Sequence, residues 1–152
     1  MQKTSSVILI GAIVVACLLL AFSSHAFFNI FNGGKVSAVD GEVVLTLSEI
    51  NDGKAHHFSY QHEGREIKFF VVKSPDGEMH AAFDACDVCY PAKRGYSQDG
   101  DFMVCNNCGM RFHSSRINHE QGGCNPAPLN HRVQGDELVI RVADLLPGAR
   151  FF

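Results

Sequence analysis

The sequence predicts a mainly β protein, a small antiparallel sandwich or barrel with cysteines on its loops. Apolar residues alternate with polar residues at a period of two in several short segments, which is typical of half-buried strands. Residues with a strong turn preference separate these segments. The composition agrees, because 12 Phe, 14 Gly and no Trp suit short strands and tight turns better than long helices. A length of 152 residues corresponds to about one domain.

Four segments ahead of the cysteine-rich region are expected to form strands: residues 42–47, 56–62, 67–73 and 78–83. In the first of them, Val43, Leu45 and Leu47 alternate onto one face. Residues 67–73 (IKFFVVK) are apolar almost throughout, which predicts a strand buried on both faces. The turn at residues 74–77 (SPDG) then predicts a hairpin, because proline presets φ and glycine accepts a positive φ.

Two further strands are expected later in the chain, at residues 101–104 and 137–142. The last strand alternates apolar and polar residues and follows a turn at Gly135-Asp136. The sequence contains neither a repeat of solenoid length nor a low-complexity tract. We therefore predict a single β-domain at residues 42–152, which carries the cysteines described below, preceded by a linker at residues 32–41.

The N-terminal segment is expected to enter a membrane. Residues 7–22 form an uncharged apolar run after Lys3, and apolar residues within 26–31 extend it to about the 20 residues that a bilayer core needs. An uncleaved anchor, a cleavable signal peptide and a lipoprotein site at Cys17 remain open for residues 1–31. All three place the rest of the chain outside the cytoplasm, as the positive-inside rule also does. We predict a single-pass bacterial cytoplasmic membrane protein, or a periplasmic or secreted one after cleavage.

Charge and motifs exclude several classes of function. The net charge is −3 and acidic and basic residues are interspersed, so there is no basic stripe to neutralise a nucleic-acid backbone. There is also no G-x-S-x-G elbow, H-E-x-x-H helix or glycine-rich phosphate loop. A carrier or metal-binding protein is therefore favoured over an enzyme, although enzymatic activity stays undecided.

The cysteines give the strongest signal in the chain. Apart from Cys17, they form one C-x2-C pair, fifteen intervening residues, a second C-x2-C pair, fifteen more residues and a single cysteine: Cys86, Cys89, Cys105, Cys108 and Cys124. Two residues between cysteines let a tight turn, or knuckle, aim both sulfurs at one point, and two knuckles make a four-thiolate cage for zinc or iron. Cys124 is a fifth ligand, a replacement ligand or a free thiol.

Three other uses of the cysteines compete with an iron site. Cysteines outside the cytoplasm commonly form disulfides, although five is an odd number. A thiol–disulfide protein would use Cys86 and Cys89, but the sequence lacks the βαβ pattern that normally carries such a motif. Zinc or copper in a structural or metal-delivery module is the main alternative, since no twin-arginine signal is present to export a folded, cluster-loaded chain.

Other residues near the cysteines are expected to play supporting roles. Met103 fits a strand interior and is assigned to the core. His113 and His119 are expected to be solvated loop residues, and Tyr90 and Tyr96 to pack over the site.

The cysteine region resembles a Rieske ferredoxin in which cysteines replace the histidines. The resemblance rests on residues 86–89 (CDVC), on 105–109 (CNNCG) followed by Phe112, and on the tail at 122–129 (GGCNPAPL). The first knuckle is one residue longer than in that family. With sulfur in place of imidazole, a more reducing centre is implied.

A closer resemblance covers residues 43–152. The segments 67–73 (IKFFVVK), 84–90 (DACDVCY), 103–109 (MVCNNCG) and 122–129 (GGCNPAPL) are similar to the FtrD-like membrane iron–sulfur family of bacterial high-affinity iron-permease systems. This resemblance implies an iron–sulfur cluster on Cys86, Cys89, Cys105 and Cys108, with Cys124 as a further metal-binding candidate. It also implies membrane attachment and electron transfer that supports iron uptake or respiration, with an iron permease or another redox protein as partner.

Overall fold

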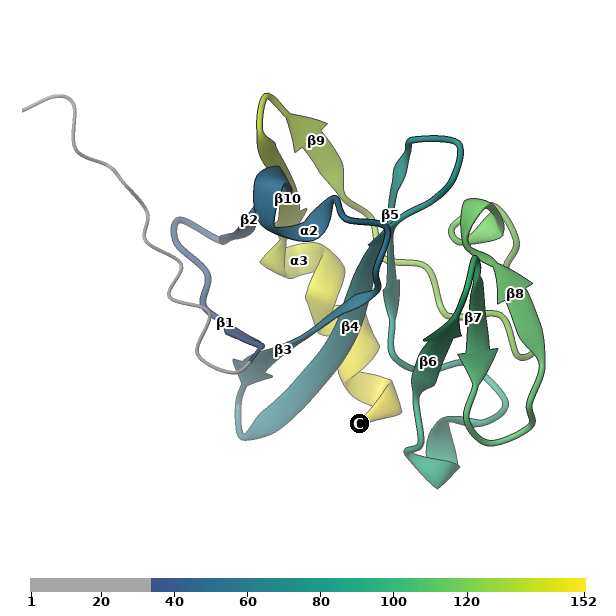
Figure 1. Ribbon diagram of the computed structural model, residues 1–152. Coiled ribbons are helices and arrows are strands. Elements are labelled where there is room, and N and C mark those ends of the chain that lie inside the picture. Colours follow the sequence, from purple (N-terminus) through teal and green to yellow (C-terminus); the bar gives the residue numbers. More distant parts are fainter. Residues whose placement is uncertain (1–33) are drawn as a thin grey trace, which may run out of the picture.

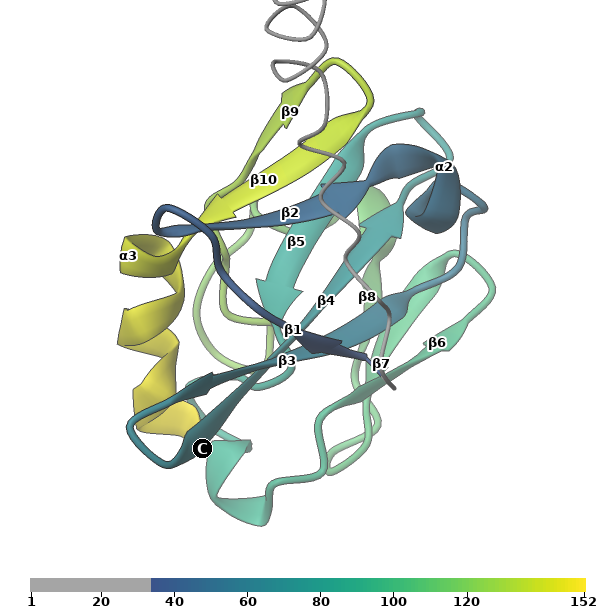
Figure 2. The same cartoon turned by 90° about the vertical axis from the view of Figure 1, so that its left-hand side faces the viewer.

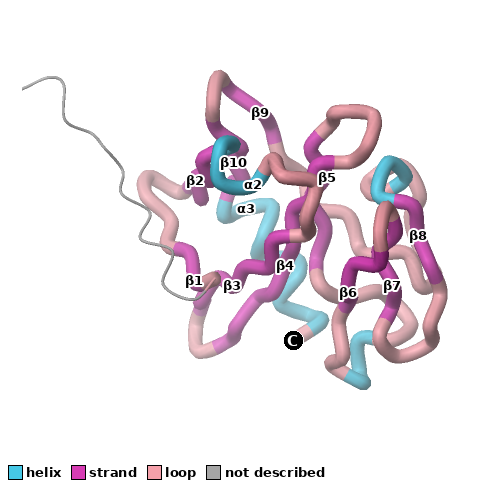
Figure 3. Tube along the Cα trace, viewed as in Figure 1, coloured by secondary structure: helices cyan, strands magenta, loops and turns pink. Residues whose placement is uncertain are grey.

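The computed structural model describes residues 34–152. The predicted anchor or signal at residues 1–31, including Cys17, lies outside the described residues. Within the described part, no helix has the length and hydropathy needed to cross a membrane. Three small β-sheets make up the domain, with short helical turns between them (Figures 1 and 3). The prediction of a mainly β, antiparallel fold is confirmed.

The first sheet has the order β1-β3-β4-β5. Its strands are β1 (Lys35–Val36), β3 (His56–His62), β4 (Arg65–Lys73) and β5 (Met79–Phe83). Strand β1 comes from the segment expected as linker and pairs in parallel with β3. Glu63 and Gly64 have φ of 46° and 79°, the backbone that a two-residue hairpin between β3 and β4 requires. The predicted turn at Ser74 to Gly77 closes the β4–β5 hairpin through a bond from Gly77 N–H to the Ser74 carbonyl at 2.9 Å.

The second sheet has the order β2-β10-β9 and lies beside the first (Figure 2). Its strands are β2 (Glu42–Thr46), β9 (Arg132–Gln134) and β10 (Glu137–Arg141). Two predicted strand ends are helical instead, because Leu47 begins α2 (Leu47–Ile50) and Val142 begins α3 (Val142–Leu145). The helical end of the chain continues as η3 (Leu146–Phe151). At both places apolar side chains pack on the core from a helical turn. The alternation of apolar and polar residues in the sequence does not distinguish such a turn from the end of a strand.

The third sheet has the order β6-β7-β8, with the second cysteine knuckle between β7 and β8 and the first knuckle in the chain ahead of β6. Its strands are β6 (Tyr96–Asp99), β7 (Phe102–Cys105) and β8 (Arg111–His113), flanked by η1 (Tyr90–Ala92) and η2 (Ser114–Arg116). In Figure 1 this sheet stands to one side of β4 and β5. Strand β7 matches the predicted segment 101–104 to within one residue, whereas β6, β8 and β9 were not predicted.

Strand β4 joins two hydrophobic cores. Ile67, Phe69 and Val71 face the core between the first two sheets, which also contains Leu45, Phe83, Leu138, Ile140 and Phe151. Phe70 and Val72 face the other way and pack with Tyr96, Met103, Ile117 and two of the cysteines. All five β4 side chains are completely buried, as the continuous apolar run predicted. Burying each contributes about 1.5–3 kcal/mol, so β4 fixes the position of the cysteine-bearing sheet.

Candidate metal centre

The first knuckle follows directly from β5. Cys86 is 1% exposed, and the chain turns so that the backbone N–H of Cys89 donates to the Cys86 sulfur at 3.1 Å. The N–H of Tyr90 then donates to the Cys86 carbonyl at 3.2 Å and η1 begins. The two residues between the cysteines are therefore used for a tight turn, as their spacing predicted.

The second knuckle is the turn between β7 and β8. Gly109 N–H donates to the Cys105 carbonyl at 2.8 Å, and Cys105 N–H donates to the Met110 carbonyl at 2.9 Å. Gly109 has a φ of +75°, which is accessible to glycine at little cost. Cys105 is buried at the end of its strand, whereas Cys108 at the tip is exposed.

Cys124 lies on a third loop, which packs against the first knuckle. Ala127 N–H donates to the Ala85 carbonyl at 2.9 Å, and Phe83 N–H donates to the Ala127 carbonyl at 2.8 Å. The buried phenol of Tyr96 donates to the Cys124 carbonyl at 2.7 Å. These bonds hold Cys124 beside residues that precede it by about forty positions.

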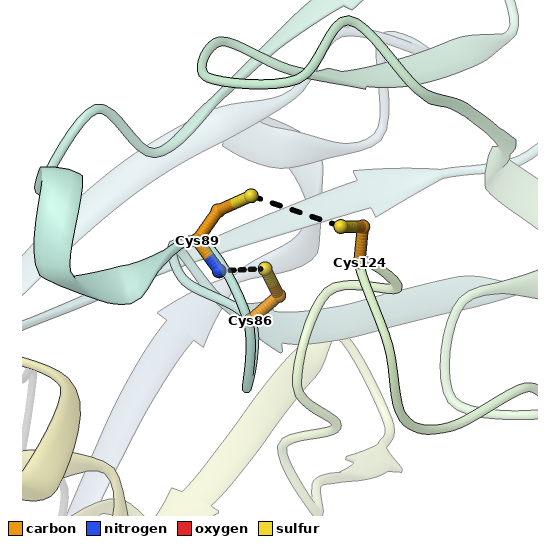
Figure 4. A group of neighbouring side chains, drawn as sticks. All are labelled: Cys86, Cys89 and Cys124. Atoms are coloured by element: carbon orange, nitrogen blue, oxygen red, sulfur yellow. Dashed lines mark hydrogen bonds between the residues drawn. The ribbon is translucent and has the colours of Figure 1, made fainter.

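The sulfurs of the five cysteines within residues 34–152 gather at one place. Cys86, Cys89 and Cys124 form one group with sulfurs within 4.8 Å of one another, and Cys89, Cys105 and Cys108 form another. Cys89 belongs to both groups, and its sulfur lies 3.7 Å from that of Cys124 (Figure 4). All five are free thiols. We call this set the thiol cluster.

The surroundings give these thiols different acidities. Burial opposes ionisation of Cys86, but the backbone N–H groups of Cys89 and Val88 and the nearby Tyr96 phenol favour the thiolate, so the net effect lowers the Cys86 pKa. Burial raises the pKa of Cys105 to about 11. A backbone hydrogen bond from Met110 lowers the pKa of the exposed Cys108 to about 7.

Cys124 is the least acidic member of the cluster for which a value is resolved. A hydrogen bond shared with Cys108, together with burial and contact with Cys89, raises the pKa of Cys124 to about 12. One thiol, Cys108, thus ionises close to neutrality without a metal. Metal binding would have to displace the remaining protons, since thiolates are the ligands.

The thiol cluster suits a thiophilic metal. Neither group of close ligand atoms in the described residues includes a histidine nitrogen or a carboxylate oxygen. An all-sulfur donor set is the one used by iron–sulfur clusters and structural zinc. Two sulfurs bound at about 2.3 Å to one tetrahedral ion lie about 3.8 Å apart, close to the Cys89–Cys124 separation. The residues therefore fit such a centre, while the ligand assignment stays a prediction.

The other singled-out residues take varied places. Met103 is completely buried, as expected. Tyr96 packs between the second core and Cys124, and burial raises its pKa well above the ordinary value. Tyr90 packs edge-on against Phe151 at a centroid distance of 5.7 Å. His113 ends β8 rather than lying in a loop, and its ring meets Phe102.

Asp84 and Gly95 make contacts that the sequence analysis did not predict. The Asp84 carboxylate accepts the N–H of Tyr96 at 2.7 Å, which ties the start of the first knuckle to β6. This carboxylate also packs directly on Gly95. The segment 84–90 and Tyr96 were both singled out in the sequence, but no local pattern indicated that Asp84 contacts the Gly95–Tyr96 backbone.

Together, the fold and the thiol cluster define a small β-domain whose loops bring together cysteines that could hold a metal. The chain belongs to the family described as membrane iron-sulfur containing protein FtrD-like, whose model matches residues 50–152. This confirms the closer of the two resemblances. No curated protein matches the sequence.

The structure of this chain is similar to one solved structure that the comparison found, the crystal structure of the quaternary ammonium Rieske monooxygenase CntA in complex with the inhibitor MMV12. The identity is 13% and the TM-score is 0.43. The match covers 65% of this chain and 30% of the monooxygenase, so this chain spans under a third of that protein's length.

Proposed function

We propose that this protein is a membrane-tethered iron–sulfur electron carrier that acts outside the cytoplasm. The convergence of five free sulfurs from three loops, without nitrogen or oxygen ligands in either close group, carries the proposal. Family membership supports the choice of iron–sulfur over other thiophilic centres. A bound cluster would supply one-electron transfer at this end of the domain.

The protein's own residues would hold and tune such a centre. The proposed ligands are Cys86, Cys89, Cys105 and Cys108, with Cys124 as a fifth sulfur that contacts Cys89. The N–H of Cys89 points at the Cys86 sulfur, and hydrogen bonds of this kind adjust the reduction potential. Cys86 and Cys105 are buried while Cys108 is exposed, so the exposed side offers the shortest path to a partner.

Anaerobic purification of the full chain, followed by iron and acid-labile sulfide analysis and electron paramagnetic resonance, tests this proposal. We expect both iron and sulfide, and a paramagnetic signal in one oxidation state. The matched pair of variants is Cys89→Ser and Cys17→Ser, because Cys17 precedes the domain. Cys89→Ser should lose the centre and Cys17→Ser should keep it. Iron-free protein that contains one tightly bound zinc would refute the electron-carrier proposal.

A second candidate is a zinc- or copper-binding structural or delivery module without redox turnover. The Cys89–Cys124 separation of 3.7 Å is also compatible with it, because this is the edge length of a tetrahedral single-ion site. The two candidates differ in sulfide content. A module of this kind would bind about one metal ion and no sulfide, and would remain colourless with zinc.

The partner and location are part of the same proposal. We place the domain on the outer side of a bacterial cytoplasmic membrane, where it would exchange electrons with an iron permease or another redox protein. Membrane attachment is supported by the family description. Fractionation of cells that express the full chain tests the location, and recovery of uncleaved protein in the cytosol would contradict it.

A further inference from the structure

We propose that the cavity beside the thiol cluster binds a small organic anion with an aromatic or similar apolar part. The cavity has a volume of about 410 Å³, within the range of ligand pockets. Its walls come from the β3–β4 hairpin end, the segment from the first knuckle to β6, and the last two residues.

The charge of the cavity wall is the first reason. Arg65, Lys68, Lys93 and Arg94 line it, against the acidic Glu66 and Asp84. Both acids are engaged, because Glu66 pairs with Lys68 at 3.5 Å and Asp84 accepts the Tyr96 N–H. A local excess of positive charge in a chain of net charge −3 favours an anion at this place.

Two of these cations are free to receive a ligand. Lys93 and Arg94 are exposed, and within residues 34–152 neither has an ion-pair partner. By contrast, Arg65 donates to the Ala149 carbonyl at 3.3 Å. Carboxylate, sulfonate or phosphate oxygens would be paired by these two side chains in charge-assisted hydrogen bonds.

The backbone holds Lys93 in an unusual conformation at the cavity wall. Lys93 has a φ of +52°, and its N–H donates to the Tyr90 carbonyl at 3.0 Å. A left-handed residue other than glycine costs free energy, and such residues cluster at ligand-binding places. Asn106 also fixes the neighbouring backbone by donating to the Arg94 carbonyl at 3.0 Å.

Aromatic groups form the apolar part of the wall. Tyr90 and Phe151 contact each other edge-on, and both line the cavity together with Tyr96 and Phe152. Cys86, Cys89 and Cys105 line it as well, so a bound anion would lie next to the thiol cluster. A ligand that only carried charge would leave the aromatic wall uncovered, which is why we assign an aromatic anion.

Isothermal titration of the metal-loaded full chain in lipid nanodiscs with 2-naphthoate tests the inference, with empty nanodiscs as blank. The matched neutral probe is 2-naphthamide, which has the same rings but no charge. We expect saturable binding of naphthoate and binding of naphthamide at least about tenfold weaker, the effect of losing one strong charge-assisted contact.

Variants distinguish the cavity from other surfaces. Lys93→Gln and Arg94→Gln should each weaken naphthoate binding by about tenfold, while Lys35→Gln, an exposed lysine on β1 away from the cavity, should not change it. Metal content and thermal unfolding of each variant report on folding separately. Absence of saturable naphthoate binding, equal binding of naphthamide, or full binding by a folded Lys93→Gln, Arg94→Gln double variant would overturn the inference.

Discussion

The sulfur of Cys89 lies 3.7 Å from the sulfur of Cys124, although 35 positions separate the two residues in the chain. A disulfide needs a sulfur–sulfur distance of about 2.05 Å, so a small movement of the Cys124 loop would allow the bond to form. The same two thiols can therefore either bind a metal or be oxidised to a disulfide.

After equilibration of metal-free protein with a mild oxidant, we expect the Cys89–Cys124 disulfide to be the main crosslink, because these two sulfurs lie 3.7 Å apart. Tryptic peptide mapping by mass spectrometry would show the crosslinked peptides. In Cys124→Ser no such crosslink is available, whereas Cys17→Ser should form it normally. A dominant Cys86–Cys89 crosslink in the wild-type protein would contradict this expectation.

Replacing Cys105 by Ser should abolish metal binding, whereas replacing His113 by Ala should leave metal content unchanged. Cys105 is buried at the end of β7 among the sulfurs, and loss of its thiolate removes a bond that orders both knuckles. His113 instead bonds to Ser115 and meets the Phe102 ring. Metal analysis of both purified variants checks this. Loss of metal in the His113 variant with retention in the Cys105 variant would show that the four-thiolate assignment is wrong.

The pattern of apolar and polar residues in the sequence was sufficient to predict the main strands but not the short ones. Strand β4 could be predicted because its residues are apolar on both faces, and both faces are buried. Strands β6 and β9 contain Ser97, Gln98 and Gln134, whose side chains carry no hydrophobic period. Their positions depend on pairing with β7 and β10, which is tertiary information.

The thiol cluster was likewise predictable from the sequence only in part. The C-x2-C spacing was enough to predict two tight turns that aim paired sulfurs at one point. The spacing could not predict the position of Cys124. Two long-range hydrogen bonds hold that residue at the site, one from the Tyr96 phenol to the Cys124 carbonyl and one between the Ala127 and Ala85 backbones. Long-range contacts of this kind leave no local pattern.

Gly95→Ala should destabilise the domain more than Gly100→Ala does. Both glycines have similar positive φ, +63° and +58°. A Cβ at Gly95 would overlap the Asp84 carboxylate, with the Oδ1 atom at 2.6 Å, while a Cβ at Gly100 meets nothing within 4 Å. We expect losses of about 2–4 kcal/mol at Gly95 and about 1 kcal/mol at Gly100. Urea unfolding of both variants measures the difference, and equal losses would show that the Asp84 contact is unimportant.

His80 should make the domain less stable as the pH falls below about 6.5. The ring is 3% exposed on β5, and its Nε2 lies 3.1 Å from the Ser74 hydroxyl. Burial lowers the pKa of His80 from 6.5, although Asp76 and Glu78 favour the charged form and His119 opposes it. Above pH 6.5 both the folded and unfolded states are neutral at this residue, so it contributes no pH dependence there.

Below that pH the unfolded chain takes up a proton on His80 before the folded domain does. The free energy of unfolding therefore decreases as the pH falls, until the pH reaches the pKa of His80 in the folded domain. In His80→Gln this part of the pH dependence should disappear, although the variant loses about 1–3 kcal/mol at all pH values through poorer packing. Urea unfolding of metal-loaded protein between pH 5 and 8 provides the measurement, with His62→Gln, beside the β3–β4 turn, as control. If wild-type and His80→Gln protein have parallel pH profiles while His62→Gln flattens the curve, the acid sensitivity comes from the surface of the hairpin and the buried ring plays no part in it.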